Sequence, residues 1–92
     1  MLRSRIIFIF ILLVSVSIKA DISDPTSVFN EGNKQYEEHN YEAAINSYKG
    51  LCEEFYSPEL FLNLGNSYYK VDDIPNTILY YEKALKLSPG NL

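Results

Sequence analysis

Residues 58–91, PELFLNLGNSYYKVDDIPNTILYYEKALKLSPGN, contain the clearest helical pattern of the chain. Apolar and small residues recur in this stretch at intervals of three and four, the spacing of one face of an α-helix. They form two runs: Leu60, Phe61, Leu64, Gly65, Tyr68 and Val71, then Ile74, Thr77, Ile78, Tyr81, Ala84 and Leu85. Only Asp72 and Asp73 separate the runs, so we expect two helices that fold back on each other as an antiparallel hairpin.

A related pattern occurs 33 positions earlier in the chain. This offset aligns seven identical pairs: Pro25 with Pro58, Asn30 with Asn63, Gly32 with Gly65, Asn33 with Asn66, Tyr36 with Tyr69, Ile45 with Ile78 and Tyr48 with Tyr81. A period of about 20 to 50 residues is typical of stacked supersecondary units that cannot bury their apolar faces alone. The sequence therefore predicts an all-α protein of two stacked helical hairpins, which indicates an interaction module.

The first copy has the weaker helical pattern. Glu31 and Gln35 interrupt its first apolar run, and we expect a helix there because its counterpart in the second copy is clear. The next helix is expected to continue to Phe55, on a stripe of Tyr41, Ala44, Ile45, Tyr48, Leu51, Cys52 and Phe55. No strand pattern is found.

Residues at the helix boundaries agree with these periods. Asp24, Asn40, Ser57 and Asp73 each precede an expected helix and can cap it with a side-chain oxygen. Ser88, Pro89 and Gly90 are expected to end the last helix.

Two glycines lie in the middle of expected helices. A glycine there costs about 1 kcal/mol relative to alanine, so a compensating contact is expected. We predict that the partner helix backbone comes close to Gly32 near Ala44, and to Gly65 near Thr77.

The first twenty residues are typical of a secretory signal peptide. Arg3 and Arg5 precede an apolar run, and a more polar segment then ends at Ala20. We expect cleavage after Ala20, with an uncleaved anchor as the alternative. The expected organisation is a signal peptide over 1–20, a short linker over 21–24, a first repeat over 25–57 and a second over 58–91.

Charge and cysteine content exclude several classes of function. Without Arg3, Arg5 and Lys19, five of the eight basic residues remain against twelve acidic ones, a net charge of −7. Such a surface repels nucleic acid, so no nucleic-acid partner is expected. Cys52 is the single cysteine, which excludes a disulfide within the chain.

No residue set suggests catalysis. His39, the single histidine, is expected in a turn and is interpreted as solvated, and no phosphate loop, metal-spaced histidine pair or nucleophile with a base is found. We expect no enzyme activity, no catalytic residue, no cofactor and no metal.

Residues 58–91 resemble the tetratricopeptide repeat (TPR), a helix-turn-helix unit of α-solenoids. The signature residues that carry the resemblance are Leu64, Gly65, Tyr68, Tyr81, Ala84 and Pro89 in the second copy, with Gly32, Ala44 and Tyr48 in the degenerate first copy. The resemblance implies two TPR hairpins, an α-solenoid fragment that binds proteins.

The segments FNEGNKQY, YEAAINSY and LFLNLGNSYYK, which follow the expected signal peptide, resemble more narrowly the exported TPR family BatE of the bacterial aerotolerance operon. That resemblance implies a location in or facing the periplasm. It also implies a membrane-associated stress complex with membrane proteins that carry von Willebrand A-type domains.

The TPR resemblance further implies a concave groove lined by the first helix of each hairpin, on a surface that also includes Thr26, Glu37, Glu59 and Lys70. The predicted partner-binding residues, which would take a peptide or helix of another protein, are Phe29, Asn30, Asn33, Tyr36, Leu62, Asn63, Asn66 and Tyr69. An asparagine amide both donates and accepts hydrogen bonds and so suits a peptide backbone. The alternative for these residues is structural, with the asparagines joining neighbouring helices.

Two alternatives to a binding scaffold stay open. The repeats can serve self-association into a homo-oligomer, because two repeats are fewer than the three or so that stable arrays need. The chain can also be a fragment of a longer, membrane-anchored TPR protein.

Overall fold

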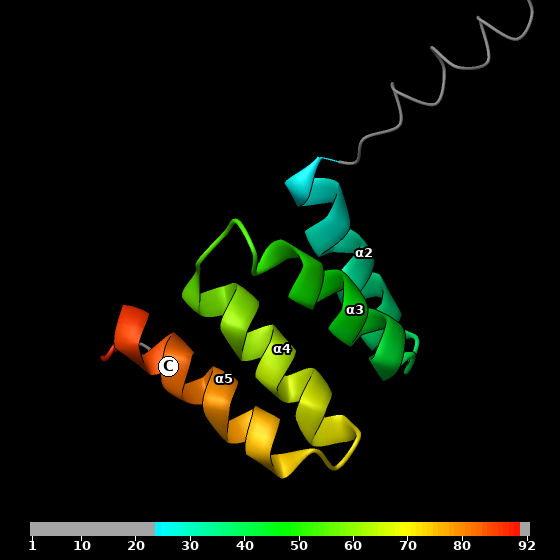
Figure 1. Cartoon of the computed structure of the whole chain (residues 1–92). Helices are drawn as coiled ribbons and strands as arrows, with labels where there is room; N and C mark the ends of the chain where they lie inside the picture. The colour runs from blue at the N-terminus through cyan, green and yellow to red at the C-terminus, as the bar shows by residue number, and fades with distance from the viewer. Residues whose placement is uncertain (1–23, 91–92) are drawn as a thin grey trace, which may run out of the picture.

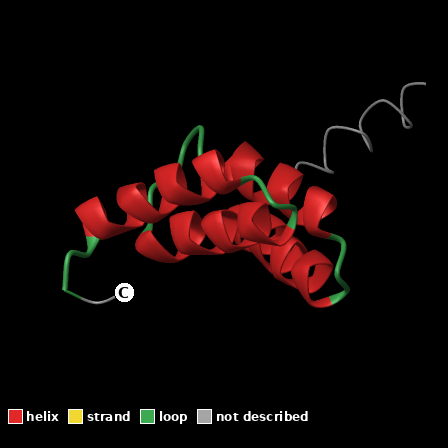
Figure 2. Ribbon diagram, turned by 90° about the horizontal axis from the view of Figure 1, so that it is seen from below, coloured by secondary structure: helices red, strands yellow, loops and turns green. Residues whose placement is uncertain are grey.

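The computed structural model describes residues 24–90, which form four α-helices. These are α2 (Pro25–Glu37), α3 (Tyr41–Leu51), α4 (Pro58–Lys70) and α5 (Ile74–Leu87). Helices α2 and α3 form the first hairpin, α4 and α5 the second, and α4 packs between α5 and the first hairpin (Figure 1). The described part contains no strand (Figure 2), so the predicted all-α architecture of two hairpins is confirmed. The expected signal peptide over 1–20 lies outside the described residues.

The core lies mainly between α3 and α4, where one hairpin meets the other. Its buried members are Ala44, Ile45, Tyr48, Leu51, Leu60, Leu64 and Tyr68. Of the repeat signature residues, Gly32, Ala44, Tyr48, Leu64, Gly65, Tyr68 and Ala84 are buried, Tyr81 is half-buried and Pro89 is exposed. Each hairpin therefore buries much of its apolar surface against the other, as expected for a stacked repeat.

Three of the four predicted helix caps are formed by side chains. Asp24 accepts from the backbone N–H of Thr26 at 3.0 Å, and Ser57 accepts from that of Leu60 at 3.0 Å. Asp73 accepts from the N–H of Asn76 at 3.3 Å. In each case the side chain satisfies a backbone donor that the helix leaves unpaired.

The predicted cap at Asn40 is wrong, because its side chain makes no capping hydrogen bond. Asp73 has almost the same backbone geometry and does cap its helix. The difference is a second contact: Asn76 Nδ2 donates to Asp73 Oδ2 at 2.8 Å, whereas the equivalent position after Asn40 is Ala43, which has no donor side chain.

Helix α3 is shorter than the apolar stripe predicted. It ends at Leu51, and the amides of Glu54 and Phe55 donate to the Leu51 carbonyl as the chain turns. Phe55 is 43% exposed and does not continue the buried stripe. The physical reason is the start of α4: Ser57 is extended, as the residue before a proline usually is, so the helix cannot run into Pro58.

The apolar stripe of α5 is covered on one side only. Thr77 and Ala84 are buried beside α4, whereas Ile74, Ile78 and Leu85 are 45%, 52% and 45% exposed. Ile45, the counterpart of Ile78 in α3, is only 9% exposed, because it packs in the core between the hairpins.

The mid-helix glycines make room for tyrosine rings. A Cβ on Gly32 would lie 2.6 Å from Cε1 of Tyr48, and one on Gly65 would lie 2.6 Å from Cδ1 of Tyr81. The predicted approach of the partner backbone is wrong for Gly32, and for Gly65 the Thr77 carbonyl oxygen is only the third nearest atom, at 3.4 Å. In both hairpins the ring crosses the first helix where it has no side chain.

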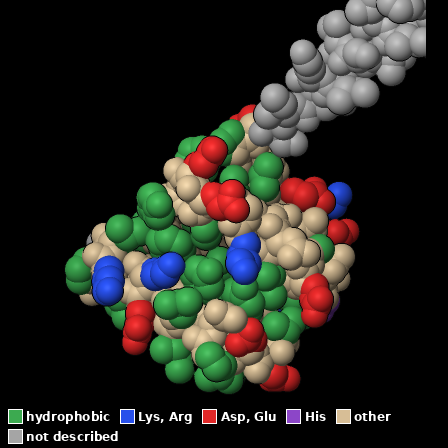
Figure 3. Space-filling view, viewed as in Figure 1, with side chains coloured by type: hydrophobic (Ala, Val, Ile, Leu, Met, Phe, Trp, Pro, Cys, Tyr) green, Lys and Arg blue, Asp and Glu red, His purple; other side chains and the backbone are tan. Residues whose placement is uncertain are grey.

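Hydrophobic side chains also reach the surface on the face shown in Figure 3, where they lie among lysines. Within the second hairpin, the Nζ of Lys83 lies 5.7 Å from the ring centroid of Phe61 and 5.2 Å from that of Tyr80. Tyr80 in turn stacks on Tyr68 with centroids 5.6 Å apart. These contacts cover part of the aromatic surface with a lysine stem and a charge that favours ring faces.

Candidate functional site: a polar pocket between the hairpins

One tyrosine and one asparagine are paired in the same way in each hairpin. The Tyr48 hydroxyl donates to Oδ1 of Asn33, and the Tyr81 hydroxyl donates to Oδ1 of Asn66. Each tyrosine comes from the second helix of its hairpin and passes the glycine that precedes the asparagine. The glycine therefore lets a phenol reach from the second helix to the polar side of the first.

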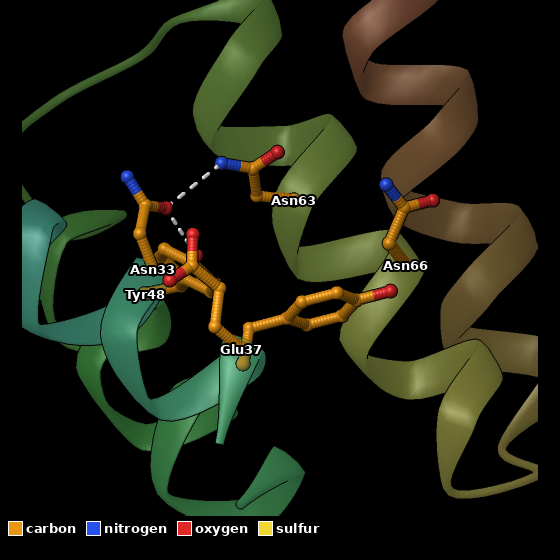
Figure 4. A pocket seen from close by; sticks show the side chains of 6 residues that line it. Asn33, Glu37, Tyr48, Asn63 and Asn66 are labelled. Carbon is orange, nitrogen blue, oxygen red and sulfur yellow. Dashed lines mark hydrogen bonds between the residues drawn. The ribbon is translucent and has the colours of Figure 1, made fainter. Parts of the chain in front are cut away.

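A third asparagine joins the two hairpins. Asn63 Nδ2 on α4 donates to Oδ1 of Asn33 on α2 at 3.2 Å, so that this oxygen accepts two hydrogen bonds (Figure 4). The oxygen of Asn66 points toward α5, and its nitrogen lies on the opposite side of the amide (Figure 4). These bonds determine which end of each amide is left for a ligand.

These groups line a pocket of about 230 Å³ between the first helices of the hairpins. Its lining consists of Asn33, Tyr36, Glu37, Tyr48, Asn63 and Asn66. Among the hydrogen bonds of the described residues, none uses Nδ2 of Asn33, Nδ2 of Asn66 or Oδ1 of Asn63. The pocket therefore offers amide donors and an amide acceptor close together.

The eight predicted partner-binding residues fall into two groups in the structure. Asn33, Tyr36, Asn63 and Asn66 meet in the pocket, whereas the other four predicted residues do not line it. Asn30 is exposed, Leu62 is half-buried and Tyr69 is 58% exposed. Phe29 instead packs against Tyr48, with ring centroids 5.8 Å apart, and lines a separate apolar cleft between the start of α2 and the end of α3.

One pocket residue was absent from the predicted groove surface. Tyr48 was expected only as a repeat signature, whereas Glu37, which ends α2 beside Tyr36, was expected on that surface. The 33-residue offset relates Asn33 to Asn66 and Tyr48 to Tyr81. It therefore indicated that these positions have the same role in each repeat. That signal could not say that the second-helix tyrosine reaches the groove, since this depends on the ring crossing a glycine.

The environment of the pocket changes the acidity of its phenols. Burial raises the pKa of Tyr48, as do the nearby Tyr36 and Glu37, while the neighbouring amide of Asn63 acts in the opposite direction. Burial also raises the pKa of Tyr81, with smaller contributions from Tyr36 and Tyr69. Both phenols are therefore neutral donors at ordinary pH, and the two asparagine oxygens that accept from them stay occupied.

Two features are absent from the described residues. No group of three or more histidine, cysteine or carboxylate side chains in residues 24–90 could hold a metal ion. Within the same range, no helix has the length and apolar content needed to cross a membrane.

Comparison with protein families gives one match. The family model described as tetratricopeptide repeat matches residues 58–91, which include α4 and α5. The second hairpin is thus similar to a tetratricopeptide repeat, and the described residues form an all-α helical-repeat fragment of two hairpins. Such repeats are typically non-enzymatic and serve protein–protein interaction. No curated protein matches the chain.

Proposed function

We propose that the pocket and its surrounding groove bind an extended segment or a helix of another protein, so that the chain acts as an interaction scaffold without enzyme activity. The observation that carries this proposal is the orientation of the amides. Both Asn33 and Asn66 commit their oxygens to tyrosines of the same hairpin, and their amino groups are left to donate. Backbone carbonyls of a partner are suitable acceptors for such donors.

The orientation of these amides also decides how the proposal is tested. An alanine at Asn33 would leave the buried Tyr48 hydroxyl without its acceptor, which typically costs about 1 to 3 kcal/mol of folding stability. Loss of binding in that variant would not show whether Asn33 contacts the ligand or only stabilises the fold. An aspartate keeps an acceptor oxygen for the tyrosine and replaces the amino group by a second oxygen.

The experiment selects binders from a displayed library of linear peptides with the full chain and with the double variant Asn33→Asp, Asn66→Asp. We expect the wild type to enrich peptides and the double variant to lose their binding by at least tenfold, with helicity retained. Asn40→Asp with Asn46→Asp is the matched control, because both residues are exposed and neither lines the pocket. Equal binding by wild type and double variant, or no enrichment by the wild type, would refute the proposal.

A second candidate function is self-association, and the exposed stripe of α5 favours it. Ile74, Ile78 and Leu85 are exposed, whereas their counterparts in the first hairpin are half-buried (Tyr41 and Cys52) or buried (Ile45). The outer face of α2 carries Ser27, Glu31 and Lys34 where α4 has Leu60, Leu64 and Ser67, so α2 of another copy is a poor cover. We infer that a dimer would pair α5 with α5, and Ile78→Glu should abolish any concentration-dependent dimer in sedimentation.

The location and the complex are proposed from the sequence alone. The charged, apolar and small-residue segments of residues 1–20 support export, and the stretches similar to the BatE family support a membrane-associated stress complex in or facing the periplasm. Its members would include membrane proteins with von Willebrand A-type domains. The test is to isolate the chain from a membrane fraction and to ask whether these membrane proteins copurify with it. Recovery of the chain in a compartment that lacks them would contradict the proposal.

A further inference from the structure

Glu37 is the charged member of the pocket lining. It is the last residue of α2 and is exposed, and the five other lining residues carry amide or phenol groups. The equivalent residue of the second hairpin is Lys70, which does not line the pocket. The described pocket thus contains an acidic group with no basic side chain in its lining.

The Glu37 carboxylate faces the pocket. Its side chain extends toward Asn33 and Tyr48 (Figure 4), and its charge contributes to the raised pKa of the Tyr48 phenol. The Tyr48 hydroxyl does not donate to this carboxylate, because it donates to Asn33. The amino group of Asn63 is likewise directed to the Asn33 oxygen. These two groups therefore do not serve the carboxylate, which keeps its acceptor capacity for a ligand.

The best complement to such a carboxylate is a cation that carries N–H donors. Hydrogen bonds between an ammonium or guanidinium group and a carboxylate are roughly twice as strong as those between neutral groups. The chain as a whole also has a formal net charge of −4, which favours the approach of a basic partner.

We propose that the pocket selects a lysine or arginine side chain within an extended partner peptide, with its cation against Glu37 and its backbone carbonyls accepting from the amides of Asn33 and Asn66. This inference rests on the proposed function and deepens it, since it names the chemistry of the bound segment. An acidic or neutral segment would leave the carboxylate without a partner.

The test uses the displayed peptide library and three forms of the full chain: wild type, Glu37→Gln and Glu38→Gln. Glu38 is the adjacent exposed residue and does not line the pocket. The substitution Glu38→Gln therefore removes the same charge without changing the pocket. We expect wild type and Glu38→Gln to enrich lysine or arginine at one peptide position. Glu37→Gln should still select peptides but lose that preference.

A selected peptide then gives a quantitative check. Replacing its basic residue by methionine should weaken binding to wild type by about fivefold, the size of a partly exposed ion pair, and leave binding to Glu37→Gln unchanged. Added salt should reduce the wild-type affinity and have a smaller effect on Glu37→Gln.

The outcomes separate this inference from the proposed function. Peptides that depend on the amino groups of Asn33 and Asn66 but show no basic preference would overturn the inference alone. The same result follows if Glu37→Gln keeps the preference. If the wild type selects no peptide, both the proposed function and the inference fail.

Discussion

At the scale of single residues, each hairpin depends on a glycine and a tyrosine that act together. The glycine leaves a gap in the first helix, the ring of Tyr48 or Tyr81 lies across that gap, and the hydroxyl donates to an asparagine. Packing and the polar surface are thereby connected through one side chain. A substitution of either asparagine that is intended to alter binding therefore also changes the folding stability.

Gly65→Ala should destabilise the second hairpin by about 1 to 3 kcal/mol, because the new Cβ would overlap the Tyr81 ring at 2.6 Å. Gly50→Ala is the matched control, since no atom lies within 4 Å of its added Cβ and alanine favours a helix by about 0.5 to 1 kcal/mol. Urea unfolding followed by circular dichroism measures both. A stabilising effect of Gly65→Ala would contradict the assignment of the glycine to the ring.

The raised pKa of Tyr48 makes a prediction about alkaline pH. Burial disfavours the phenolate, so the folded state holds the proton more tightly than the unfolded state, in which the pKa is near the ordinary 10.0. The contribution of the neutral phenol to stability is complete below this value and is lost as the pH rises through the raised folded pKa. The melting temperature should therefore fall as the pH rises above about 10.

The variant Tyr48→Phe tests the source of this dependence. It should be less stable at neutral pH by about 1 kcal/mol, because the hydrogen bond to Asn33 is lost, and its melting temperature should fall less steeply in alkali. An alkaline slope equal to that of the wild type would assign the effect to other groups.

At the scale of the elements, the two hairpins turn in the same unusual way. His39 and Asp72 have φ angles of 64° and 62°, the left-handed region that favours glycine. They lie 33 positions apart, so each marks the same point of its repeat. The short link between antiparallel helices is thus closed by a strained residue in both copies.

His39→Gly should stabilise the first hairpin by about 0.5 to 1 kcal/mol, because glycine adopts this conformation without a Cβ penalty. Asn40→Gly is the matched control: its φ is −93° and its side chain makes no capping bond, so it should give no gain. Thermal unfolding of both variants measures the difference. Equal effects would show that the positive φ carries no cost at His39.

At the scale of the whole molecule, the two ends of the described solenoid differ. The outer face of α2 is polar at Ser27, Glu31 and Lys34, whereas the outer stripe of α5 exposes Ile74, Ile78 and Leu85. A polar outer face is what a terminal repeat needs in order to meet water. The first hairpin therefore has the character of a capping unit, and the second that of an inner one.

This difference predicts opposite outcomes for two equivalent isoleucines. Ile45→Ala should cost about 2 to 4 kcal/mol, because Ile45 is 9% exposed in the core between the hairpins. Ile78→Ala should change stability by less than about 0.5 kcal/mol, since Ile78 is 52% exposed. Chemical unfolding of the monomer at low protein concentration measures both, and a large loss for Ile78→Ala would indicate that its side is covered.

Local sequence signals are enough to predict the helices, the prolines that begin them and the repeat offset. These features depend on residues within one or two turns of each other, and amphipathic periods and proline geometry act over that range. They were sufficient for the all-α fold, while the face on which Asn33, Tyr36, Asn63 and Asn66 lie was implied by the resemblance to the tetratricopeptide repeat. The same local rules could not predict that Asn40 lacks the second contact that helps Asp73 to cap.

Tertiary packing determines which of two equivalent residues is buried and which end of an asparagine amide is free to bind a ligand. Ile45 and Ile78 share a pattern, yet their burial depends on whether another hairpin covers them. Asn33 and Asn66 look like free binding groups in the sequence, but tyrosines fifteen residues away occupy their oxygens. Burial and hydrogen bonding are set by the element that packs from a distance, and the local sequence does not encode that packing.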